Sequence, residues 1–72
     1  MLLSMIYHAL IERDRATGVY VGSVPGIPGA HSQGDTVDEV RRNLAEVLEL
    51  LQEEGALEPE SDYIATTTVA MA

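Results

Sequence analysis

The sequence has 72 residues, no cysteine, four arginines against twelve acidic residues, and a formal net charge of −8. A domain of this size buries little apolar surface, and without cysteine it has no disulfide or thiolate metal site to compensate, so we expect copies of the chain to associate. The shortage of basic side chains disfavours direct binding to nucleic acid, which depends on neutralising phosphate groups.

The chain opens with two predicted strands. Residues 3–12 place apolar side chains on both alternating faces, which is typical of a strand covered on both sides. A polar connection ending at Gly18 leads to a second strand over residues 18–24, where β-branched valines predominate. The apolar start is too short to span a bilayer and lacks a basic flank, so we expect a cytoplasmic protein without membrane contact.

A corner rich in proline and glycine follows the second strand. Pro25 and Pro28 cannot donate to a sheet ladder, so the backbone must leave the strand there. Gly26 and Gly29 accept the left-handed backbone conformation that sharp turns require. A short third strand, at residues 30–33, fits between this corner and the next element.

A helix is predicted over residues 37–54. Thr36 and Glu39 have the spacing of a capping box, and Gly55 is suited to end the helix in a left-handed conformation. Apolar side chains recur at three- and four-residue steps and give one broad apolar face. These positions are Val37, Val40, Leu44, Val47, Leu48 and Leu51. After a loop, residues 63–71 return to β-branched and apolar side chains and are predicted to form the last strand.

The predicted order of elements is β-β-β-α-β in one domain spanning residues 1–72, an α+β fold. A strand–helix–strand crossover is right-handed in nearly every known case. If the last strand runs parallel to the first and pairs with it, the sheet is mixed and four-stranded, with the order 3-2-1-4. The helix then packs on one face, and the topology corresponds to part of a ribonuclease H sheet.

The negative charge belongs to the second half of the chain. Residues 1–34 carry equal numbers of acidic and arginine side chains, whereas residues 35–62 carry ten acidic residues and two arginines. This distribution predicts attraction to a basic protein partner. The alternative, that acidic side chains simply keep a small protein in solution, is equally compatible with the charge.

The stretch from Val24 to Thr36 reads V-P-G-I-P-G-A-H-S-Q-G-D-T and resembles the V-P-x-x-P-G-x-x-x-x-G-D-T core of HicB-like antitoxins. Upstream, Gly18-Val-Tyr-Val is similar to the G-x-Y-V second strand of that family. The resemblance implies a partial ribonuclease H-like fold and a protein that binds and inhibits a HicA-like toxin, a ribonuclease that cleaves messenger RNA. Family members often add a C-terminal DNA-binding segment; the sequence stops at Ala72, so we expect no direct nucleic-acid binding.

No group of residues predicts catalysis, a metal site or a cofactor. Two-metal phosphoryl chemistry needs converging carboxylates, whereas Glu12 ends the first predicted strand and the helix acids lie mostly on the solvent face. His31 and Ser32 point to opposite faces of a short extended segment, so they cannot form a relay with Asp35. We therefore expect no enzyme, and a degenerate ribonuclease H-like nuclease is the less favoured alternative.

We expect the protein to act by binding, as an antitoxin that covers a small basic HicA-like ribonuclease. A second interpretation is a homo-oligomer of the same family without a toxin partner. In either case we expect a homodimer or homotetramer, joined through the uncovered sheet face or by pairing of the last strand. The candidate partner-binding residues are Tyr20, Pro25, Ile27, Pro28, His31, Glu46 and Glu49.

Overall fold

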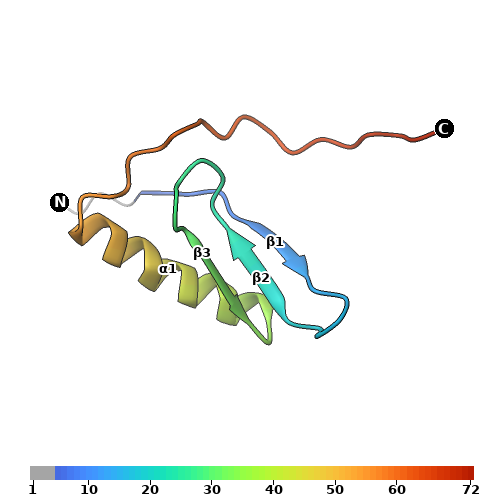
Figure 1. Ribbon diagram of the computed structural model, residues 1–72, viewed down its shortest axis with the longest axis horizontal. Coiled ribbons are helices and arrows are strands. Elements are labelled where there is room, and N and C mark those ends of the chain that lie inside the picture. The colour runs from blue at the N-terminus through green and yellow to red at the C-terminus, as the bar shows by residue number, and fades with distance from the viewer. Residues whose placement is uncertain (1–4) are drawn as a thin grey trace.

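A computed structural model of the chain describes residues 5–72 (Figure 1). Within these residues it has three strands, β1 (Leu10–Arg13), β2 (Tyr20–Ser23) and β3 (His31–Gly34), followed by one helix, α1 (Val37–Glu53). The strands form one antiparallel sheet in the order β1-β2-β3, so β1 and β3 are its edges. The helix packs over β3 and β2 on one face, which gives two layers.

The expected four-stranded mixed sheet of order 3-2-1-4 is wrong. Every strand pair in the described chain is antiparallel, and residues 63–71 do not join the sheet. After α1, the N–H of Glu60 donates to the carbonyl of Gly26 at 2.7 Å, and the chain then runs out past the sheet (Figure 1). The β-branched residues of this segment favour an extended backbone, but a strand also needs a partner edge, which local propensity does not specify.

The first strand is shorter than predicted. The pattern indicated residues 3–12, but pairing with β2 begins at Leu10, opposite Ser23. Residues 5–9 precede β1 without a ladder partner because β2 ends before the proline-glycine corner. Residues 3 and 4 lie outside the described part of the chain. The bounds of the other two strands and of the helix differ from the predicted ones by at most two residues.

The proline-glycine corner supplies much of the small core. Val24, Ile27 and Ala30 are buried together. The N–H of Val24 donates to the carbonyl of Ala30 at 2.9 Å, and Gly26 and Gly29 have φ values of 85° and 82°, so the backbone closes the corner on itself. The half-buried side chains that pack against this core are those of Tyr7, Leu48, Leu51 and Leu57.

The helix is capped at both ends. The side chain of Thr36 accepts a hydrogen bond from the N–H of Glu39 at 3.1 Å, which satisfies one of the free N–H groups of the first turn. Gly55 follows the helix with a φ of 69°, the left-handed conformation that ends many helices. The buried residues of the helix are Val40 and Leu44, which face the sheet.

The helix lies close against Gly22 in the central strand. A Cβ atom on Gly22 would lie 2.5 Å from Cγ1 of Val40, 2.9 Å from Cδ1 of Leu44 and 3.0 Å from Cδ1 of Ile11. These separations are well below ordinary carbon–carbon contact distances. The two layers therefore meet at a strand position that has no side chain.

Replacing Thr36 with alanine should lower the free energy of unfolding by about 0.5–2 kcal/mol, because the N–H of Glu39 loses its acceptor. Thr36→Ser keeps a hydroxyl oxygen in place and should retain most of the stability. Urea unfolding followed by circular dichroism, at one protein concentration for all variants, measures both changes. Equal stability of Thr36→Ala and the parent would contradict the role of the cap.

Gly22→Ala should destabilise the fold by about 1–3 kcal/mol, since the new methyl group overlaps Val40 and Leu44. Val40→Ala removes Cγ1 and makes room for that methyl group. The double variant should therefore be more stable than the sum of the two single losses predicts. Urea unfolding of the three variants measures this coupling, and strictly additive losses would count against the overlap.

Candidate partner-binding surfaces

The face of the sheet opposite α1 is largely exposed. Gly22 points toward the helix, as do its cross-strand partners Ile11 and Ser32, so neighbouring strand positions point outward. The outward side chains mix apolar, polar and charged types, which gives the face no single chemical character. They are Leu10, Glu12, Val21, Ser23, His31 and Gln33.

The predicted partner-binding residues do not form one surface. His31 is exposed on the outward face of β3, whereas Tyr20 is half-buried and lies on the helix side of β2. Glu46 and Glu49 are exposed on α1, on the other side of the molecule from His31. A single partner surface therefore cannot include all of these residues.

The corner contributes less to the surface than its sequence suggested. Pro28 is exposed and Pro25 is half-buried, but Ile27 is 8% exposed and belongs to the core. Ile27 therefore stabilises the corner, and its side chain is not available to a partner. Sequence reasoning could not separate these three because they share one turn.

Acidic side chains line the solvent side of α1. Helical geometry places Glu46, Glu49 and Glu53 opposite the buried Val40 and Leu44. All three carboxylates belong to exposed residues, one or two helical turns apart. This arrangement makes an acidic stripe along the back of the C-terminal half of the helix, and the exposed Arg42 lies on the same face one turn before it.

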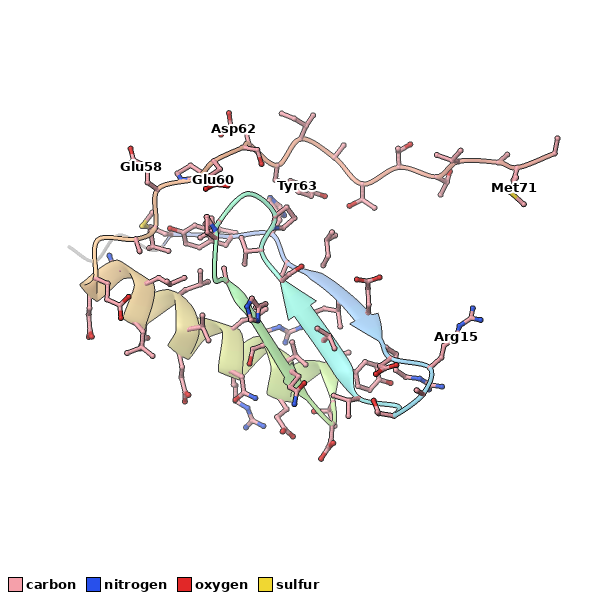
Figure 2. The ribbon with its side chains drawn as sticks, in the orientation of Figure 1. Arg15, Glu58, Glu60, Asp62, Tyr63 and Met71 are labelled. Atoms are coloured by element: carbon pink, nitrogen blue, oxygen red, sulfur yellow. The ribbon has the colours of Figure 1, made fainter. Side chains whose placement is uncertain are left out.

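The negative charge continues beyond the helix. Figure 2 shows Glu58, Glu60 and Asp62 in succession along the segment that follows α1. All three are exposed, as is Glu54 at the end of the helix. We call the helix stripe and these residues together the acidic surface, which consists of Glu46, Glu49, Glu53, Glu54, Glu58, Glu60 and Asp62.

An apolar groove of about 500 Å³ lies between α1 and the segment that leads into β1. Met5 and Ile6 line it on one side and Leu44 and Leu48 on the other, with Ile11 of β1 between them. The groove exists because α1 packs over β3 and β2 and leaves the helix side of β1 uncovered. Sequence reasoning missed the groove, although the apolar character of both faces of the first predicted strand was a signal for it.

Residues 62–72 form an extended segment, which we call the C-terminal arm. At its start, the ring of Tyr63 stacks on that of His8 with centroids 4.7 Å apart, and the Tyr63 hydroxyl lies 2.9 Å from Oγ1 of Thr66. Further along, Val69 and Met71 are 89% and 95% exposed, and Figure 2 shows Met71 far from the two layers. The arm thus leaves the molecule with its apolar side chains in solvent.

Within residues 5–72, no cluster of three or more histidine or carboxylate side chains is placed to bind a metal ion. Glu12 points to the outward face of the sheet, whereas the acidic residues of α1 lie beyond the opposite face. In the same part of the chain, no helix combines the length and apolar character that crossing a bilayer requires.

Three related proteins share most or much of this sequence. A UPF0150 protein of Synechocystis sp. is 43% identical over 65 residues, which cover 90% of this chain and 93% of the relative. A UPF0150 protein of Thermotoga maritima is 55% identical over 49 residues, or 68% of this chain and 65% of the relative. A UPF0150 protein of Archaeoglobus fulgidus is 32% identical over 65 residues, with the same coverage as the first. No solved structure matches the chain significantly.

The sequence also matches a defined protein family over residues 7–72, and this match takes in the sheet, the corner, α1 and the C-terminal arm. The family is described as the HicB-like antitoxin of bacterial toxin-antitoxin systems. The match confirms the resemblance carried by the corner motif from Val24 to Thr36. The chain therefore belongs to the HicB-like antitoxin family.

Proposed function

We propose that this protein is an antitoxin-type binding module that neutralises a HicA-like, mRNA-cleaving toxin by direct contact, and that it has no catalytic activity of its own. Membership of the HicB-like antitoxin family supports a toxin partner in general. The observation that carries the finer proposal is the acidic surface along α1 and the segment after it.

A ribonuclease that grips RNA needs basic side chains against the phosphate groups. Exposed carboxylates on a folded scaffold attract the same basic side chains, and a protein bound there excludes the RNA. Among the described residues, the ion pair that forms joins Arg41 to Asp38 at 2.8 Å, outside the acidic surface. The carboxylates of the acidic surface therefore keep their charge available for a partner.

A homo-oligomer without a toxin partner is the second candidate function. The apolar groove and the exposed C-terminal arm favour it, because both are surfaces that water solvates poorly. We propose a homodimer or homotetramer under either function. We also propose a cytoplasmic location, where messenger RNA is cleaved, and no direct contact with nucleic acid, because the net charge of −8 repels phosphate.

Charge reversal on the acidic surface tests the first candidate. Glu49→Lys should weaken binding to a small basic HicA-like ribonuclease by about fivefold or more at low salt, because an attractive contact becomes repulsive. The loss should shrink as salt concentration rises, since screening shortens the range of the charge. Calorimetric titration measures the affinity, and cleavage of a labelled RNA measures the inhibition.

Glu12→Lys is the matched control for Glu49→Lys. It makes the same change in net charge at an exposed residue on the outward face of the sheet, away from α1. Its affinity for the ribonuclease should stay within about twofold of the parent. RNA cleavage that continues unimpeded in excess parent protein would overturn the proposed function, and equal losses for the two variants would overturn the role of the acidic surface.

A further inference from the structure

The C-terminal arm has the properties of a β-strand that lacks a sheet. Residues 63–72 carry no charged side chain, and β-branched residues fill five of the six positions from Ile64 to Val69. The arm stretches the molecule to 48 Å and raises the radius of gyration to 13.8 Å. A compact domain of this length has a radius of gyration of about 11 Å. The excess arises because the arm does not pack against the two layers.

The edge formed by β1 and the segment that leads into it is uncharged over most of its length. Exposed sheet edges are normally blunted by charge, by proline or by a covering element, because their free N–H and C=O groups pair readily with another chain. Residues 5–11 contain no proline, acidic residue, lysine or arginine, and the charged residues of the edge are Glu12 and Arg13 at the end of β1. The apolar groove lies directly beside this edge, on the helix side, and Ile11 lines it.

The arm and the edge match in length, and most of each is uncharged. Eleven extended residues, 62–72, span about 36 Å, and the nine residues 5–13 span about 30 Å, so the arm is long enough to follow the whole edge. Two copies at −8 each repel one another at long range. Contact between the uncharged parts of the arm and of the edge brings two copies together without setting one carboxylate against another.

The arm does not fill the groove of its own chain. Its root is held outside the groove. The N–H of Glu60 bonds to the carbonyl of Gly26, and Tyr63 stacks on His8, which does not line the groove. From there it runs past the sheet to the free end of the chain (Figure 1), and Val69 stays in solvent. The groove and the arm thus both lack a partner within one copy.

We propose that the C-terminal arm of a second copy of this chain adds to the open edge of β1 and places alternate side chains, Val69 and Met71 among them, in the apolar groove. The chain's own sheet keeps its three strands, and the added strand belongs to the other copy. The exchange is reciprocal in a two-fold dimer, so each copy gives one arm and receives one. It requires no toxin, so its test is separate from that of the proposed toxin binding, although it builds on the proposed homo-oligomer.

Val69→Asp tests the exchange in the full chain. Because Val69 is 89% exposed within one copy, the substitution leaves the fold of the single copy intact, but it puts a carboxylate into the groove of the partner. Self-association should weaken by about thirtyfold or more, since an unpaired charge is costly to bury. Val69→Thr keeps the β-branched shape and should stay within about fivefold of the parent. Sedimentation equilibrium at about 1 to 100 µM, the concentration range in which weak to moderate dimers dissociate, measures all three association constants.

The site of contact is identified by NMR on a mixture of isotope-labelled and unlabelled parent chains. Intermolecular contacts should join the arm to residues 5–11, and the arm amides should be protected from hydrogen exchange in the parent but not in Val69→Asp. A monomeric parent at the highest concentration would overturn the proposal. So would equal association of Val69→Asp and the parent, arm–arm contacts in place of arm–edge contacts, or pairing of the arm with its own chain. None of these readouts involves a ribonuclease, so failure here leaves toxin binding untouched.

Discussion

The close packing of α1 on Gly22 is the contact on which the rest of the structure depends. Val40 and Leu44 occupy the space that a side chain on the central strand would take, and this fixes the helix over β2 and β3. The buried core is small; among the described residues its members are Val24, Ile27, Ala30, Val40 and Leu44. Because the helix sits toward one side of the sheet, β1 keeps an uncovered flank, and the apolar groove is the direct result.

The parts of the fold that the sequence predicts are those with local causes. The turn after β1 is closed by the carboxylate of Asp14, which accepts from the N–H of Ala16 at 3.0 Å and the hydroxyl of Thr17 at 3.1 Å, and by Gly18 with a φ of 77°. The Thr36 cap is likewise predictable, because it depends only on the four residues from Thr36 to Glu39. The prediction of a fourth strand failed because β-propensity indicates an extended backbone but does not specify which edge of the sheet that backbone pairs with. That choice depends on where the chain goes after α1, which no local pattern encodes.

The sequence predicted the family of the protein, but it predicted less well which residues are exposed and share one surface. The corner motif identified the HicB-like antitoxin family because turn-forming residues in fixed order are specific. The same motif does not distinguish exposed from buried residues, since a turn places neighbours on opposite sides: Pro28 faces solvent and Ile27 faces the core. Helical periodicity, in contrast, placed Glu46 and Glu49 on the solvent side correctly, because a repeat of 3.6 residues determines the direction of each side chain as well as the backbone conformation.

Gly26 has a consequence that reaches beyond its own turn. A Cβ atom there would overlap the carbonyl of Ser61, so the missing methyl group is what lets the returning chain lie flat on the corner. The segment that leads into the C-terminal arm therefore packs on the corner motif, which carries the resemblance to the HicB-like antitoxin family. A bulkier residue at position 26 would displace this part of the chain, and a tilt of about 5° there moves the far end of an eleven-residue extended arm of about 36 Å by about 3 Å. The absence of a side chain at Gly26 thus determines the direction in which the whole C-terminal arm leaves the domain.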